Sequence, residues 1–221
     1  MRRTHEDAEK TRQTILDASI QVFIKKGYTH TTMDDISNAA NVTRGAVYWH
    51  FKNKEDILIE LADSIYKETS QKAAFFFSQK TSLHEKISNT LKNLCYWYLE
   101  DEQARQKRIM LIATFANRDH TLMDKIFFSL YPEEKSIPDN SQIIKFVMGK
   151  TWKRFQLDSI AGKAAEAECS EAFLIINSFI EGLISVIVRI PEVMTRKSID
   201  NIIDKFMEGF FHTYKHILEA K

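Results

Sequence analysis

Apolar residues near the C-terminal end of the chain recur with the period of an α-helix, and this pattern limits the possible folds most strongly. They fall three positions and one position apart, at Ile199, Ile202, Ile203, Phe206, Met207, Phe210, Phe211 and Tyr214. Such spacing places side chains along one face of a helix. No segment alternates apolar and polar residues with a period of two, and only 6 glycines and 3 prolines occur in 221 residues. The pattern predicts an all-α fold.

Capping residues predict the first two helices. The apolar pattern that begins near residue 15 stops at Gly27, and glycine readily accepts the left-handed conformation of a helix C-cap. Thr32 precedes Asp35 by three residues, which is the spacing of a capping box. A short helix is therefore predicted over residues 33–40.

Two further starts follow closely. Asn41 and Val42 interrupt the short helix, and Thr43 is placed to cap a second short helix that runs to about His50. Asn53 is placed to cap a third, longer helix. Two short helices separated by such a break are typical of a helix-turn-helix, whose second helix enters the major groove of DNA.

The charge pattern supports the same interpretation. From Ile36 to Lys54 the chain has no aspartate or glutamate, whereas Arg44, Lys52 and Lys54 are basic. The whole chain carries a net charge of only +1, so any affinity for nucleic acid must come from a local surface. Phosphates favour a surface that lacks carboxylates. The segment is predicted to bind DNA.

Side-chain chemistry suggests how the second short helix would contact DNA. Arg44 can make two hydrogen bonds with a guanine, and Val47 can touch a thymine methyl group. Thr43, Tyr48 and His50 can donate hydrogen bonds to phosphates, which fixes the register of the protein on the duplex.

Two other residues are candidates for the DNA backbone. Gly45 would allow a close approach of the backbone, and Lys54 at the start of the next helix can bind a phosphate together with the helix amides. The predicted DNA-binding residues are Thr32, Thr43, Arg44, Gly45, Val47, Tyr48, His50 and Lys54.

The run "TRGAVYWHFKNKEDIL" begins at Thr43, and with the residues around it the segment 8–62 resembles the DNA-binding region of the tetracycline-repressor (TetR) family, especially its multidrug-efflux repressor branch. A glycine, four ring residues and two lysines rarely occur at this spacing by chance. The resemblance implies that Tyr48 and His50 face the DNA backbone, while Trp49 and Phe51 mainly pack. It also implies a three-helix DNA-binding domain over residues 1–54 and a larger helical ligand-binding and dimerisation domain over residues 55–221.

The C-terminal region favours a homodimer. Two predicted helices, Phe173–Ile190 and Ile199–Ile217, are too apolar to have only one buried face. A four-helix bundle formed with a second copy would bury the surplus, although both helices can also be central in a monomer. The predicted interface residues are Phe173, Ile176, Ile180, Ile184, Ile187, Ile203, Phe206 and Phe210.

Aromatic and methionine residues gather in the middle of the chain. Cavities lined by such residues suit flat, apolar and often cationic ligands, although most of these side chains are expected to be ordinary core. Glu181 lies within an apolar helix, where it can neutralise a cationic ligand or pair with Arg189 or a partner subunit. The candidate ligand-binding residues are Tyr66, Phe115, Met148, Trp152, Phe155 and Glu181.

Catalytic and metal-binding motifs find little support. The sequence "HEKIS" at His84 starts like a zinc-protease motif, but Ser88 stands where the second histidine is required. Cys95 and Cys169 lie far apart, fit no zinc or disulfide framework and are typical of a reducing cytoplasm. The N-terminal residues lack the apolar core of a signal peptide, and polar residues interrupt the run at 173–190. We expect a cytoplasmic protein with no cofactor, membrane span or enzymatic activity.

The combined expectation is a ligand-responsive transcriptional repressor. A homodimer would bind a palindromic double-stranded operator and be released by a small hydrophobic or cationic effector, and the resemblance implies control of a multidrug efflux system. One alternative is an activator or a regulator of a metabolic operon with the same DNA domain. A second is a helical small-molecule carrier or enzyme, which the acid-free segment at 36–54 argues against.

Overall fold

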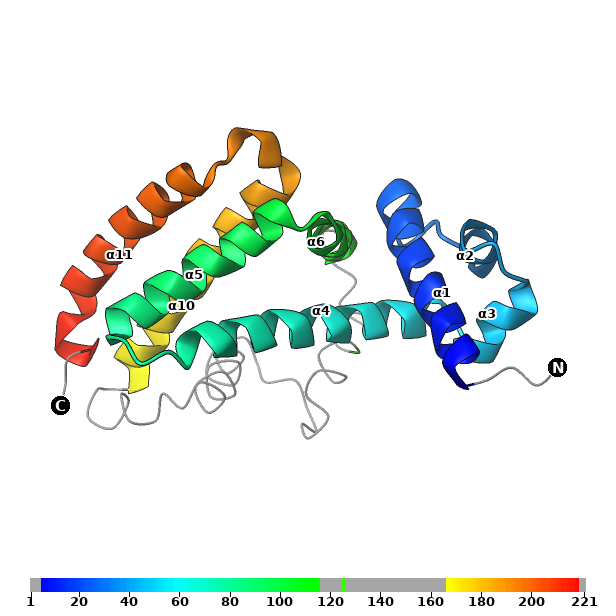
Figure 1. Cartoon of the computed structure of the whole chain (residues 1–221), viewed down its shortest axis with the longest axis horizontal. Helices are drawn as coiled ribbons and strands as arrows, with labels where there is room; N and C mark the ends of the chain where they lie inside the picture. The colour runs from blue at the N-terminus through cyan, green and yellow to red at the C-terminus, as the bar shows by residue number, and fades with distance from the viewer. Residues whose placement is uncertain (1–4, 116–124, 126–165, 219–221) are drawn as a thin grey trace. The chain divides into compact units, whose positions relative to one another are not determined.

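The computed structural model describes residues 5–115, 125 and 166–218, and all the regular elements among them are helical (Figure 1). The prediction of an all-α fold is confirmed for these residues. The α-helices are α1 (His5–Lys26), α2 (Met33–Ala39), α3 (Arg44–His50), α4 (Lys54–Phe77), α5 (Leu83–Glu100), α6 (Glu102–Phe115), α10 (Glu166–Arg189) and α11 (Arg196–Leu218), and a 3-10 turn, η1, spans Pro191–Val193. None of these helices is both long and apolar enough to cross a membrane.

The described residues form two compact units. The first contains residues 5–67, 103–115 and 125, and the second contains residues 68–102 and 166–218. Helix α4 contributes residues to both. The first unit is larger than the segment 1–54, because the start of α4 and part of α6 share its hydrophobic core. The division of function at residue 54 stays a prediction.

The start of α2 has the predicted capping box. The Thr32 hydroxyl accepts a hydrogen bond from the Asp35 amide at 3.1 Å, and the Asp35 carboxylate accepts one from the Thr32 amide at 2.9 Å. Before it, α1 ends at Gly27, which has a φ of 76° and supplies the left-handed residue that the sequence predicted. These local contacts fix the first turn between helices.

The boundaries of α3 also follow from local chemistry. Asn41 has a φ of 52°, a conformation that asparagine tolerates better than most residues, and it turns the chain between α2 and α3. The Thr43 hydroxyl then accepts from the Ala46 amide at 3.1 Å. At the next start, the Asn53 side chain accepts from the Asp56 amide at 2.9 Å. All three predicted caps of the short-helix region are therefore present.

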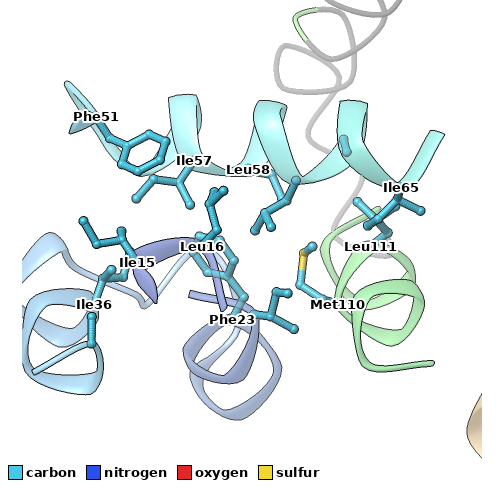
Figure 2. Close-up of a cluster of buried hydrophobic side chains, with 14 of the residues drawn as sticks. Ile15, Leu16, Phe23, Ile36, Phe51, Ile57, Leu58, Ile65, Met110 and Leu111 are labelled. Carbon is cyan, nitrogen blue, oxygen red and sulfur yellow. The ribbon is translucent and has the colours of Figure 1, made fainter. Parts of the chain in front are cut away.

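A single hydrophobic core holds the short helices α2 and α3 in place. Isolated helices of seven residues are unstable in water, so their order depends on this packing. Figure 2 shows side chains from α1, α2, α4 and α6, together with Phe51, meeting in this core. Burying each large aliphatic side chain contributes roughly 1.5–3 kcal/mol. The labelled members are Ile15, Leu16, Phe23, Ile36, Phe51, Ile57, Leu58, Ile65, Met110 and Leu111.

In the second unit, α5 packs against both α10 and α11 (Figure 1). Polar contacts join α5 to α11: the Lys92 ammonium lies 2.6 Å from an Asp204 carboxylate oxygen, and the Tyr96 hydroxyl donates to Asp200. Cys95 is completely buried on α5, and burial raises the pKa of its thiol to about 12. This thiol is therefore protonated and protected from reagents.

Candidate nucleic-acid interface

Helix α3 buries one edge and exposes the other. Val47 is 0% exposed and Phe51, just after the helix, is 3% exposed. Residues four apart share a face of a helix, so these two define the edge that meets the core. Tyr48 is 43% exposed and Trp49 is 71% exposed. The surface of α3 thus carries two exposed rings, and Arg44 on the same helix is also exposed.

Two sequence-based assignments on α3 are wrong. Val47 is fully buried and does not reach the surface where a thymine methyl group would lie. Trp49, which was expected to pack, is exposed, and its ring meets the edge of the His50 ring at 4.4 Å between centroids. The expectation for Trp49 came from the resemblance, which placed alternate rings on opposite faces, whereas a helix repeats every 3.6 residues. Val47 was assigned from its side-chain chemistry alone, but it lies on the edge of α3 that meets the core. The predicted packing of Phe51 is confirmed.

Arg44 stands at the first position of α3 and contacts α2. Its Nη1 donates to Asp34 Oδ2 at 3.2 Å, and its Nε lies 3.1 Å from Asp34 Oδ1. The guanidinium also lies over the Tyr48 ring, 5.4 Å from the centroid. A hydrogen bond with Tyr48 and the charge of Asp34 raise the pKa of Arg44 above its ordinary value. The arginine is therefore always charged and held at the exposed edge.

The other polar candidates also lie near this edge. Thr43 is exposed, and His50 is half-buried. Among the described residues, a Cβ added to Gly45 would meet only the Thr43 hydroxyl, at 4.0 Å, so packing within this part of the chain does not require a glycine there. Thr32 is exposed, but its hydroxyl donates to Asp35 at 2.8 Å and serves the cap of α2.

Lys54 has a different position from the expected one. Its ammonium donates to the carbonyls of Tyr28, Thr29 and Thr31, at 2.8, 2.9 and 2.9 Å. An ammonium has three protons, and these contacts use all of them. Partial burial also lowers the pKa of Lys54. The expected phosphate contact of this side chain is not supported, because the lysine instead fastens the loop after α1 to the start of α4.

Both carboxylates at the start of α2 have basic partners. The Lys26 ammonium lies 2.6 Å from Asp35 Oδ1, and Arg44 contacts Asp34. The hydrogen bond from Lys26 and those from Thr32 lower the pKa of Asp35 to about 2. Neutralised carboxylates repel an approaching polyanion less than free ones do. The exposed edge of α3 and Lys52 therefore form a surface suited to DNA.

Short capped helices joined by a tight turn, the second with an exposed, carboxylate-free edge, define the helix-turn-helix class of DNA-binding domain. Residues 15–61 match the family described as bacterial regulatory proteins, tetR family. The match lies within the first unit of the chain.

A curated relative supports the same assignment. The chain is 46% identical over 67 residues to the HTH-type transcriptional regulator TtgR of Pseudomonas putida. The match covers 30% of this chain and 32% of the relative, so it spans about a third of the length of that protein.

Solved structures extend the likeness in fold to nearly the whole chain. One is NalD, the secondary repressor of the MexAB-OprM multidrug efflux pump in Pseudomonas aeruginosa, with a TM-score of 0.62, 21% identity and coverage of 94% of this chain and 96% of that one. Another is a SmeT–triclosan complex, with a TM-score of 0.64, 21% identity and coverage of 92% and 91%. At this identity the likeness shows the fold alone.

The candidate ligand-binding residues are divided between the two units and the residues outside the description. Tyr66 is half-buried on α4 in the first unit, and Glu181 is exposed on α10 in the second. Phe115 ends α6, but its side chain is outside the description. Met148, Trp152 and Phe155 lie outside the described residues. Ligand binding by this set stays a prediction.

Most of the residues predicted to form the dimer interface are buried within their own chain. They pack inside their own chain, because they occupy the helix edges that meet neighbouring helices. The buried ones are Ile180, Ile184, Ile187, Ile203 and Phe210. Ile176 and Phe206 are half-buried, and the Phe206 ring stacks on Phe179 at 3.7 Å between centroids, while the Phe173 side chain is outside the description.

A different strip of α10 and α11 is apolar and exposed. On α10 it contains Ile175 and Val186, which are 39% and 42% exposed, and just after α10 it contains Ile190, which is 43% exposed. On α11 it contains Ile202, which is 39% exposed. Gly182 on α10 and Gly209 on α11 have nothing within 4 Å of an added Cβ. We call these six residues the apolar strip. Glycines in mid-helix were the sequence signal that would have found it, because they cost helix stability without serving a turn.

Proposed function

We propose that the protein is a repressor of transcription whose homodimer binds a palindromic operator. The observation that carries this proposal is the exposed edge of α3, where Arg44, Tyr48 and Trp49 project from a helix that matches a DNA-binding family. The segment 36–54 offers no carboxylate to oppose phosphates. A carrier or enzyme would have no need for that combination.

Each exposed group has a role in this proposal. Arg44 reads a guanine, because its fork of donors matches the two acceptors in the major groove. Thr43, Tyr48 and His50 contact phosphates, as the resemblance implied. Trp49 joins them, since its indole N–H is a donor and its ring is exposed.

Lys52 replaces Lys54 as the phosphate-binding lysine in this proposal. Lys52 is exposed, whereas Lys54 donates its three hydrogen bonds to loop carbonyls. The exposed residue keeps its ammonium available for a phosphate oxygen.

The homodimer would form through the apolar strip. A symmetric interface brings the same surface of two copies together, so α10 and α11 of each copy would build a four-helix bundle. Gly182 and Gly209 would allow the partner backbones to approach closely, which would explain two glycines that no contact among the described residues requires. A dimer also supplies two α3 helices for two half-sites about 34–36 Å apart.

An effector would act on this dimer by binding one conformation better than the other. Support for a hydrophobic or cationic effector comes from the similar fold of the triclosan complex and from the aromatic content of the sequence. The likeness to a repressor of a multidrug efflux pump makes an efflux system the proposed target.

A binding titration against the DNA upstream of the protein's own gene tests the proposal. It is run at two salt concentrations, with and without a panel of cationic and aromatic drugs. We expect tight, salt-sensitive binding that a drug releases, and Arg44→Ala should weaken operator binding about ten-fold or more. Binding that no drug releases would point to a metabolite as effector. Absence of binding at either salt concentration would overturn the DNA-binding role.

A further inference from the structure

Gly45 and Trp49 lie at the centre of the exposed face of α3. A helix turns by about 100° per residue, so the direction opposite the fully buried Val47 falls between them, within about 20° of each. Residues four apart are neighbours on a helix surface, so Gly45 and Trp49 lie one above the other. A molecule that approaches α3 from the side opposite the core therefore meets these two residues.

Contacts among the described residues do not explain this pair. A glycine within a helix is less favourable than an alanine, yet a Cβ added to Gly45 would meet only the Thr43 hydroxyl, at 4.0 Å, in the described part of the chain. Trp49 is 71% exposed, although its ring contacts the His50 ring. The proposed phosphate contact uses only the indole N–H, so it leaves the apolar part of this ring without a role.

We propose that Gly45 and Trp49 determine specificity for thymine by receiving its C5-methyl group. This inference rests on the proposed DNA-binding function. Thymine is the one standard base that presents a methyl group in the major groove. The Trp49 ring supplies apolar contact area for it, and the missing Cβ of Gly45 leaves room for it. Val47, which was expected to make this contact, lies on the opposite side of the helix.

The first test removes the methyl group from the DNA. A duplex of about 30 base pairs is recovered from a random pool by binding to the wild-type protein, and each thymine is replaced in turn by deoxyuridine, which lacks only the methyl group. At one thymine position in each half-site, this replacement should weaken wild-type binding about four-fold, the effect of exposing one buried carbon group. At thymines that α3 does not contact, the affinity should stay the same.

The second test removes the ring. In Trp49→Ala, the same deoxyuridine replacement should change the affinity by less than about 1.5-fold, because the surface that covers the methyl group is absent. Lys52→Ala is the matched control. It also weakens binding, through a lost phosphate contact, but it should keep the difference of about four-fold between the two duplexes. Titrations at low salt keep these weakened complexes measurable, because phosphate contacts are strongest there.

The third test moves a methyl group from the DNA to the protein. Gly45→Ala should melt no lower than wild type, because alanine favours the helix and its Cβ meets no closer contact among the described residues than 4.0 Å. This Cβ would occupy the room of the thymine methyl group, so the variant should bind the thymine duplex about five-fold more weakly than wild type. It should bind the deoxyuridine duplex at least as tightly as wild type does. A structural role for Gly45 would instead weaken binding to both duplexes equally.

Three results would overturn the inference. The first is a selected duplex in which no single thymine is sensitive to deoxyuridine. The second is the same sensitivity in Trp49→Ala as in wild type, and the third is an equal loss of affinity for both duplexes in Gly45→Ala. Failure of the proposed function is distinguishable from these results, because the wild-type protein would then enrich no duplex from the pool.

Discussion

The exposed edge of α3 and the apolar strip of α10 and α11 are two surfaces with contrasting chemistry. The first carries aromatic and basic side chains, and the second carries aliphatic side chains and glycines. On α3, the exposed Tyr48 ring lies under the Arg44 guanidinium, and the exposed Trp49 ring meets the His50 ring. On α10 and α11, exposed aliphatic side chains stand beside Gly182 and Gly209. A surface with cations and hydrogen-bonding ring side chains suits a polyanion, because phosphates are bound by positive charge and hydrogen-bond donors. Aliphatic side chains next to bare backbone suit another apolar helix.

The comparison shows that the residues around an exposed apolar side chain indicate which kind of partner it suits. Single exposed apolar residues are common and require no explanation. Exposed rings on a helix that also carries an exposed arginine predict a polar partner. An exposed valine four residues from a glycine predicts close packing with another helix. The predictions below test each half of this contrast, beginning with the largest effect.

The strongest test concerns the two edges of α3. Phe51→Ala removes a ring that is 3% exposed and should lower the free energy of unfolding by about 3–5 kcal/mol. Trp49→Ala removes a ring that is 71% exposed and should change it by less than about 0.5 kcal/mol, while weakening DNA binding. Urea denaturation of both variants measures the difference. Equal losses of stability would contradict the assignment of the buried edge.

The apolar strip is tested by placing a charge on it. Val186→Glu should leave the monomer folded, because the residue is 42% exposed, but it should weaken dimerisation at least about ten-fold by burying a charge in the symmetric interface. Sedimentation equilibrium gives the dimer dissociation constant. Gln79→Glu, an exposed site between α4 and α5, is the matched control. A variant as dimeric as the control would show that the strip is not the interface.

Lys52 and Lys54 test which lysine near α3 binds a DNA phosphate. Lys52→Ala should flatten the plot of log affinity against log salt by about 0.9, because one phosphate contact is lost. Lys54→Ala should leave this slope unchanged and instead destabilise the fold by roughly 1 kcal/mol, because it removes hydrogen bonds to three carbonyls. DNA titrations at several salt concentrations and urea denaturation provide both readings. A flatter slope for Lys54→Ala would restore its phosphate contact.

The smallest effect concerns acid stability. The pKa of Asp35 falls from 3.8 to about 2 in the folded protein, so this carboxylate contributes stability above pH 3.8. The contribution is lost as the pH falls from 3.8 towards 2, because the unfolded state binds the proton more tightly. Wild type should therefore lose more stability than Asp35→Asn across this interval in urea titrations. Parallel losses in the two proteins would show that the Lys26 and Thr32 contacts do not persist in solution.

Local chemistry made much of the first unit predictable. The caps at Thr32, Thr43 and Asn53 each act on an amide three residues away, so the sequence contains both partners. Gly27 likewise predicted the end of α1. Such short-range rules located α2 and α3 to within a residue, although α2 ends at Ala39 and was predicted to end at residue 40.

The features that could not be predicted from the sequence depend on contacts between residues far apart in the chain. Lys54 binds carbonyls that lie 23 to 26 residues earlier, and no local rule links them. On α10, Ile180, Ile184 and Ile187 have helical spacing that fits either an internal core or a subunit interface. In a helix that is apolar nearly all round, spacing does not say which edge meets α5. The position of the neighbouring helix makes that choice.

The three hydrogen bonds from the Lys54 ammonium also have a consequence for local unfolding. One ammonium holds Tyr28, Thr29 and Thr31 to the first residue of α4. The loop cannot leave the helix start without breaking three hydrogen bonds at once. Segments joined in this way open together in native-state hydrogen exchange. The loop after α1 and the first turn of α4 therefore form one cooperative opening unit, although 23 residues of sequence separate Thr31 from Lys54.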